Sequence, residues 1–154
     1  MNTYEREAIG NIVIIRNMIF KNNVSYKKEI DHSWEMGRPC IIIHSDDEYD
    51  YFLAMKSNPD YEKYGHKYIP INKDDLLNII IHRYNRFENT RSRQREITGA
   101  VNLENVYRIP ISGHDEVGKL TFGTYKYIIK RLKYYYNTED LNEIIKNAES
   151  IRGR

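Results

Sequence analysis

Residues 34–57 read WEMGRPCIIIHSDDEYDYFLAMKS, and this stretch decides the fold. Pro39 stands at the start of an apolar run, where a strand tolerates proline, and Ile41–Ile43 supply β-branched side chains. The acidic residues of 46–50 form a turn, and residues 51–57 read as the next strand. Strand, polar turn and strand in this order predict part of a mostly antiparallel sheet.

The flanking sequence adds further strands to this sheet. Residues 9–20 are rich in β-branched side chains and read as a strand that opens after Gly10. Residues 21–36 are polar and read as an exposed loop. Short strands are expected near 67–71 and at 105–111. The strands therefore occupy mainly the first half of the chain.

Three helices are expected where apolar residues recur at helical spacing. The first begins at Asn72, with Asp75 in its first turn, and its apolar residues continue to Phe87. The second covers 125–136 and the third 141–148, after a GHDEVG segment that reads as a turn. The apolar stripe of the second helix comprises Tyr125, Ile128, Ile129, Leu132 and Tyr136, and Lys126, Lys130 and Lys133 lie on the opposite side. This order predicts an α+β domain in which helices pack against a small, curved, mostly antiparallel sheet or barrel.

Length and composition limit the classes of protein that remain. The 154 residues fit one domain, residues 1–154, with a helical and basic insertion at about 74–100. Cys40 is the single cysteine, so we expect no disulfide partner and no cysteine-rich zinc site. No apolar run approaches the roughly 20 residues that span a bilayer, and the first ten residues lack a signal sequence. A cytoplasmic protein without membrane contact is the expectation.

The formal net charge of +2 conceals an uneven distribution. Residues 1–80 hold 10 basic and 13 acidic residues, a balance of −3, and residues 81–154 hold 14 and 9, a balance of +5. Two basic clusters account for the difference: Arg83, Arg86, Arg91, Arg93 and Arg95, and then Lys119, Lys126, Lys130, Arg131 and Lys133. Tyrosines interleave with both clusters, which favours a polyanion as partner, although each cluster is also compatible with an ordinary solvated face.

Several motifs along the sequence, taken in order, indicate a family. Arg38–Pro39 opens an apolar strand, the strand ends at Ser45–Asp46, and the next strand ends at Lys56–Ser57. Gly10–Asn11 precedes the first strand. This arrangement resembles the toxin endoribonucleases with the MazF/PemK-like fold, in which an Arg-Pro, a Ser/Asn-Asp turn and a strand-end Thr/Ser follow one another.

The longer chain, with its helix and Arg-rich loop, is more similar to the type III toxin–antitoxin endoribonucleases, the ToxN and CptN group. Trp34 lies four residues before Arg38, a spacing that this group shares. Lys56 departs from the group, which often has Thr at that position, and Ser57 matches it. The resemblance implies a bacterial, cytoplasmic toxin of a phage-defence system. It also implies a repeat-derived RNA antitoxin that holds the toxin inactive in a closed protein–RNA oligomer.

The resemblance also implies the chemistry and the site. Such enzymes cleave RNA sequence-selectively by attack of the 2′-hydroxyl, which leaves a 2′,3′-cyclic phosphate, without metal or cofactor. Ser57, Lys56 and Arg38 would supply one hydroxyl and two cations for the developing dianion, and Lys56 or His66 would move protons. RNA contacts are expected from Tyr26, Lys27, Trp34, Arg83, Arg86, Arg91, Arg93, Arg95, Lys119, Lys126 and Lys130.

Other interpretations of the same residues stay open. Arg38 could form a surface ion pair with Asp46, and Ser57 could cap a turn. The chain could be a non-catalytic RNA- or protein-binding module, or a type II toxin of the same fold with a protein antitoxin. The DNA upstream of the gene separates the two toxin types, because a tandem repeat with a terminator encodes an RNA antitoxin and a small reading frame encodes a protein.

Overall fold

The computed structural model of the chain describes residues 8–16, 37–56, 62, 65–79, 99–111 and 115–150. Eight strands belong to these ranges: β1 (Asn11–Arg16), β2 (Gly37–Ser45), β3 (Tyr49–Lys56), β4 (Tyr68–Ile71), β5 (Leu76–Ile79), β6 (Gly99–Pro110), β7 (Asp115–Leu120) and β8 (Glu149–Ser150). The helical elements are two 3₁₀ turns, η2 (Gly65–Lys67) and η3 (Lys73–Asp75), and two α-helices, α4 (Phe122–Tyr135) and α5 (Leu141–Ile145).

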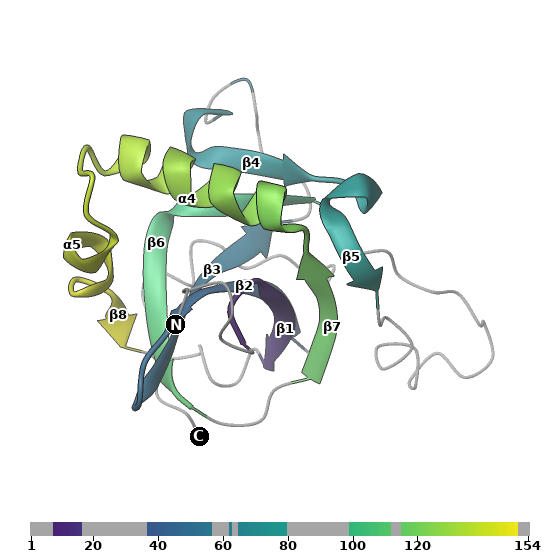
Figure 1. Cartoon of the computed structure of the whole chain (residues 1–154), viewed down its shortest axis with the longest axis horizontal. Helices are drawn as coiled ribbons and strands as arrows, with labels where there is room; N and C mark the ends of the chain where they lie inside the picture. Colours follow the sequence, from purple (N-terminus) through teal and green to yellow (C-terminus); the bar gives the residue numbers. More distant parts are fainter. Residues whose placement is uncertain are drawn as a thin grey trace.

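The strands form one curled sheet in the order β4-β6-β3-β2-β1-β7-β5, with β8 also paired to β6. All pairs along this path are antiparallel, and only β6–β8 is parallel. Register shifts interrupt several ladders, including β2–β3 and β3–β6, and such bulges bend and twist a sheet. Figure 1 shows the resulting half-barrel, with α4 across one end of it. The predicted α+β fold with a curved, mostly antiparallel sheet is confirmed.

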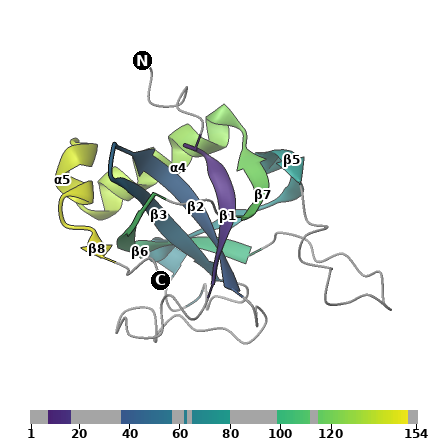
Figure 2. The same cartoon turned by 90° about the horizontal axis from the view of Figure 1, so that it is seen from below.

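The hairpin β2–β3 lies at the centre of the sheet (Figure 2), and it confirms the strand, turn and strand predicted for this stretch. Asp46 holds the turn, because its Oδ1 accepts hydrogen bonds from the backbone N–H groups of Glu48, at 2.8 Å, and Tyr49, at 2.7 Å. Burial alone would raise the pKa of Asp46, but these bonds and one from Tyr51 lower it below its ordinary value. Pro39 lies inside β2, two residues after its start, and not at the first position as expected.

Both faces of the central strands are buried, which explains the continuous apolar run at 41–43. Alternate side chains point to opposite faces, so Ile41 and Leu53 face the helices while Ile42 and Phe52 face the other way. The helices cover the first face with five buried side chains: Tyr125, Ile128 and Leu132 of α4, and Ile144 and Ile145 of α5.

The predicted second helix is confirmed as α4, and the third is confirmed as α5 up to Ile145, three residues before its predicted end at 148. Thr121 caps α4, because its side chain accepts a hydrogen bond from the backbone N–H of Thr124 at 3.2 Å. Asn137 follows α4 with a φ of 56°, in the left-handed region that ends many helices. Asp140 caps α5 by accepting from the backbone N–H of Asn142 at 2.9 Å. Local signals therefore set both helices, as sequence reasoning expects.

The helix predicted from Asn72 is wrong over Leu76–Ile79, which form β5 and pair with β7. Asp75 does act as a cap, since its side chain accepts from the backbone N–H of Asn72 at 2.8 Å, but the structure it closes is one 3₁₀ turn. Pairing with β7 then satisfies the backbone, and Leu77 remains 64% exposed. The remainder of the predicted helical insertion, beyond Ile79 and up to 98, lies outside the described residues.

The turn predicted at GHDEVG is also wrong where the structure describes it. Residues 115–120 form β7, which lies between β1 and β5 in the sheet. Only Val117 and Leu120 are apolar and buried in this strand, so its own sequence carries little strand signal. The strand predicted at 105–111 begins much earlier, at Gly99, because β6 pairs with β4 over its first four residues.

The buried hydroxyl of Tyr125 joins α4 to the sheet and predicts a pH effect. It donates to the carbonyl oxygen of Ile43 at 2.8 Å, and burial raises the pKa of Tyr125 from 10.0 to about 12. A raised folded pKa means that this contribution is intact below pH 10.0 and is lost as pH rises toward 12. The melting temperature, measured from pH 8 to 11.5, is therefore expected to fall more steeply with pH for the native chain than for Tyr125→Phe. Parallel curves for the two proteins would contradict this assignment.

Candidate nucleic-acid interface

The outward side of α4 carries cations and aromatic rings. At about 100° per residue, the buried side chains of Tyr125, Ile128 and Leu132 occupy one side, so the lysines at 126, 130 and 133 occupy the other. The predicted lysine side is confirmed, and the predicted apolar stripe is confirmed except at Tyr136, which follows the helix and is 37% exposed. Within α4 the sequence FGTYKYIIKRLKYY contains four basic residues and no acidic one. We call this side the α4 face, made of Phe122, Lys126, Tyr127, Lys130, Arg131, Lys133 and Tyr134.

Three aromatic rings of the α4 face are exposed to solvent: Phe122 by 44%, Tyr127 by 49% and Tyr134 by 84%. Two of them already contact cations. The ammonium of Lys126 lies 5.3 Å from the ring centre of Phe122, and the guanidinium of Arg131 lies 5.8 Å from that of Tyr127. Arg131 also donates to the Tyr127 hydroxyl at 3.0 Å. Exposed rings beside cations are the combination that nucleic-acid bases and phosphates recognise.

His66 lies beside α4 and not beside Lys56. Its ring stacks on Tyr135, with ring centres 6.0 Å apart and an angle of 20° between the planes. Its carbonyl oxygen accepts from Arg131 at 3.4 Å. The next residue, Lys67, is held by Glu104 of β6, whereas Lys56 pairs with Ala100, four positions earlier on that strand. The structure therefore places His66 at the border of the α4 face.

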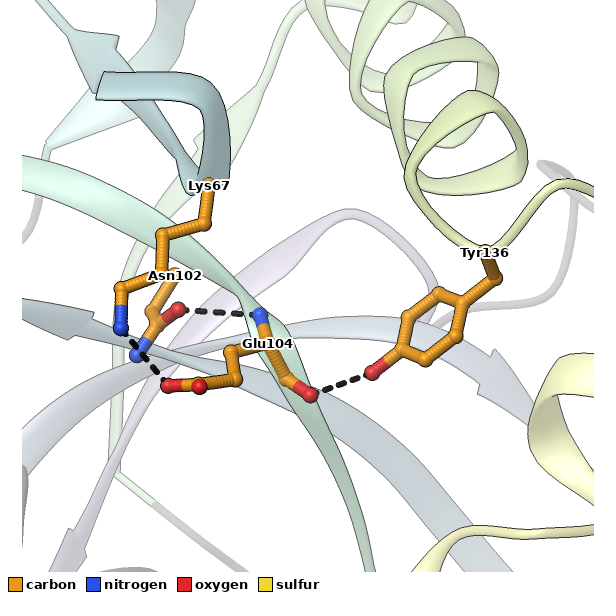
Figure 3. Close-up of polar contacts among 4 residues, drawn as sticks. All are labelled: Lys67, Asn102, Glu104 and Tyr136. Atoms are coloured by element: carbon orange, nitrogen blue, oxygen red, sulfur yellow. Dashed lines mark hydrogen bonds and ion pairs between the residues drawn. The ribbon is translucent and has the colours of Figure 1, made fainter. Parts of the chain in front are cut away.

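A network of polar contacts lies at this border of the α4 face, as Figure 3 shows. Lys67 forms an ion pair with Glu104 at 2.8 Å, and Tyr136 donates to the carbonyl oxygen of Glu104 at 2.5 Å. Asn102 accepts from the backbone N–H of Glu104 at 2.9 Å. Burial alone would lower the pKa of Lys67, but the hydrogen bond and charge of Glu104 raise it above its ordinary value. The network joins β6 to the C-terminal end of α4 and neutralises one cation.

A cleft near this border is acidic, in contrast to the basic α4 face. A cleft of about 500 Å³ opens between β6, α5 and β8. Its lining comprises Glu104, Asn105, Val106, Tyr136, Thr138, Glu143, Ile144, Asn147 and Glu149. Three carboxylates among these side chains make the cleft unfavourable for a polyanion. The electrostatics thus separate the α4 face from its acidic neighbour.

Lys119, which was predicted to contact RNA, lies on β7 and bonds across to β1. Its ammonium donates to the carbonyl oxygen of Ile9 at 3.2 Å and to Oδ1 of Asn11 at 3.1 Å. These bonds hold two neighbouring strands together. Lys119 is therefore separate from the α4 face, although the sequence groups it with the lysines of the helix.

Arg38 and Lys56 occupy the same end of adjacent strands. Cys40 of β2 pairs with Ala54 of β3, Arg38 lies two residues before Cys40, and Lys56 lies two residues after Ala54. The backbones of the two residues therefore lie near one another on neighbouring strands. Lys56 is half-buried.

Asp46 lies at the opposite end of β2 from Arg38. Eight residues separate them, which corresponds to roughly 26 Å of strand at ~3.3 Å per residue. The Asp46 carboxylate accepts hydrogen bonds from the backbone N–H groups of Glu48 and Tyr49 and, at 2.8 Å, from the hydroxyl of Tyr51. Its neighbour Ser45 is buried and donates to Asp50 at 2.7 Å. An Arg38–Asp46 ion pair is therefore excluded, and the Ser45–Asp46 motif serves the hairpin turn.

The other predicted site residues lie outside the described residues: Ser57, Tyr26, Lys27, Trp34, Arg83, Arg86, Arg91, Arg93 and Arg95. Tyr26 was the tyrosine predicted to contact RNA, and the rings of α4 were not singled out. The signal was present, because Tyr127 and Tyr134 are seven residues apart, close to two helical turns, and therefore share a side of the helix.

Within the described ranges, no three side chains of His, Cys, Asp or Glu gather closely enough to hold a metal ion. None of the described helices is both long and apolar enough to cross a membrane. No protein-family model matches the sequence, and comparison with curated proteins and with solved structures finds no similar chain.

Proposed function

We propose that this chain is an RNA-binding endoribonuclease that holds RNA on the α4 face. The observation that carries the proposal is the combination, on one helix side, of four cations, no carboxylate and three exposed aromatic rings. Phosphates attract the cations, and every base has a face that stacks on an aromatic ring.

For the reaction, we propose transesterification within the RNA strand. The 2′-oxygen forms a bond to the adjacent phosphorus, the bond from phosphorus to the 5′-oxygen breaks, and the product carries a 2′,3′-cyclic phosphate. One proton leaves the 2′-hydroxyl and one reaches the departing 5′-oxygen. Arg38 and Lys56, at the same end of β2 and β3, support this proposal because their charges would stabilise the dianionic transition state. Ser57 completes the proposed site.

The biological setting follows from the motif resemblance. We propose a bacterial toxin of a type III toxin–antitoxin system, silenced by a folded repeat RNA with which it closes into a protein–RNA oligomer. A repeat with a terminator upstream of the gene is the expected arrangement, and a small upstream reading frame would instead indicate a type II system. The cations of the α4 face would attract either RNA or an acidic protein. The exposed rings favour RNA, because bases stack on aromatic rings.

Cleavage in the presence of EDTA tests the enzymatic part of the proposal. Purified protein is expected to cut bulk RNA at preferred sequences in excess EDTA, and the fragments are expected to carry 2′,3′-cyclic phosphate ends. The measurement is electrophoresis with end-group analysis. RNA that binds but stays intact would favour a non-catalytic RNA-binding module, and RNA that neither binds nor is cut would overturn the proposal.

A further inference from the structure

The α4 face is organised in two rows. Lys126, Lys130 and Lys133 lie within about 60° of one another around the helix axis, at ~100° per residue. Tyr127 and Tyr134 lie within about 20° of each other on the adjoining strip, by the same spacing. The rows run parallel to the axis, with the lysines on one side and the tyrosines on the other. A strand of nucleic acid has the same division, since phosphates follow one side and bases the other.

The exposure of the rings distinguishes between forms of RNA. In a duplex the bases stack on one another inside the helix, so their faces are hidden from a protein side chain. In an unpaired strand the faces are open and stack on exposed aromatic rings. Tyr134 presents 84% of its surface and Tyr127 49%, so both rings have area for such stacking. Lysines alone would bind either form.

We propose that the α4 face binds an unpaired segment of RNA, with phosphates along the lysine row and bases stacked on Tyr127 and Tyr134. The two rings stand about 10 Å apart along the helix axis, since seven residues rise ~1.5 Å each. The segment therefore contacts both rings only if it runs along the helix. This inference rests on the proposed function and specifies which form of RNA the face selects.

Binding of a labelled 12-nucleotide 2′-O-methyl RNA, measured by fluorescence anisotropy on the full chain, tests the inference. The 2′-O-methyl group removes the attacking hydroxyl, so cleavage cannot distort the affinity. The single strand is expected to bind at least tenfold more tightly than the same strand annealed to its complement. Tyr134→Ala is expected to weaken single-strand binding roughly 5- to 150-fold, the loss of one stacked base.

Two matched variants separate stacking from charge. Tyr134→Phe keeps the ring and is expected to retain the native affinity. Lys130→Ala is expected to weaken single-strand and duplex binding alike and to lower the slope of log affinity against log salt by about 0.7, the value for one phosphate of a single strand. Tyr134→Ala is expected to leave this slope unchanged. Because Tyr134 is 84% exposed, its replacement leaves the core intact.

Two outcomes would overturn the inference in distinguishable ways. Equal affinity for single strand and duplex, with Tyr134→Ala binding as the native chain does, would show that charge alone binds RNA and would leave the proposed function in place. Absence of binding to either form would overturn the inference together with the proposed function.

Discussion

Arg38→Ala is expected to lower RNA cleavage by roughly 10²–10³-fold, the usual loss when one group that stabilises transition-state charge is removed. Affinity for RNA is expected to change little, because Arg38 lies on β2 and supplies none of the side chains of the α4 face, which makes the proposed contacts. The measurement combines cleavage rates in EDTA with anisotropy on 2′-O-methyl RNA. Induction of the native chain in bacteria is expected to arrest growth under the proposed function, and induction of the Arg38→Ala variant is expected not to.

Variants of the neighbouring positions assign roles within the site. Ser57→Ala is expected to relieve growth arrest as Arg38→Ala does. Lys56→Arg keeps the charge without a readily lost proton, so it retains activity if Lys56 stabilises charge and loses it if Lys56 moves a proton. Lys146→Ala is the matched control, because this exposed lysine forms an ion pair with nearby Glu143 of α5, at 3.2 Å. Undiminished toxicity of both Ser57→Ala and Arg38→Ala would overturn the site assignment.

Phe52→Ala is expected to lower the free energy of unfolding by about 3–5 kcal/mol, the cost of removing a large buried ring. Phe52 is fully buried in β3 and stacks on Tyr107 of β6, with ring centres 5.5 Å apart and planes inclined by 28°. Both rings belong to the core on the sheet face opposite the helices. A loss of this size is a large part of the total stability of an ordinary domain.

Chemical denaturation followed by circular dichroism measures this loss. Leu77→Ala is the matched control, since Leu77 is 64% exposed and its truncation is expected to change stability by less than about 0.5 kcal/mol. The comparison isolates burial from the mere loss of an apolar group. A loss below 1 kcal/mol for Phe52→Ala would contradict a tightly packed core on the sheet face opposite the helices.

The sequence predicted the elements whose signals are local. The hairpin of 37–56 has an apolar run, an acidic turn and a second run, and α4 and α5 combine apolar periodicity with capping side chains. Strands β5 and β7 were missed because their side chains give no such signal. LLNI at 76–79 fits helical spacing as well as a strand, and DEVGKL at 115–120 contains only two buried apolar residues. Their pairing with each other decides their conformation.

The candidate site likewise contains residues whose position local spacing predicted and residues whose position depends on tertiary contacts. Helical spacing predicted that Lys126, Lys130 and Lys133 lie opposite the apolar stripe, and the structure confirms it. The same cluster included Lys119, which bonds to Ile9 and Asn11 on β1, because strand pairing brings residues more than a hundred positions apart into contact. Sequence reasoning had no means to recognise that contact.

The sequence by itself determined the class of fold, the hairpin and both helices, because turn chemistry, capping and periodicity act between residues a few positions apart. The tertiary structure alone decided that β5 is a strand, that Lys119 bonds to β1, and that His66 lies beside α4 and away from Lys56. Each of these depends on hydrogen bonds or ring contacts between elements. Such contacts form only when the sheet curls and brings its strands and α4 together.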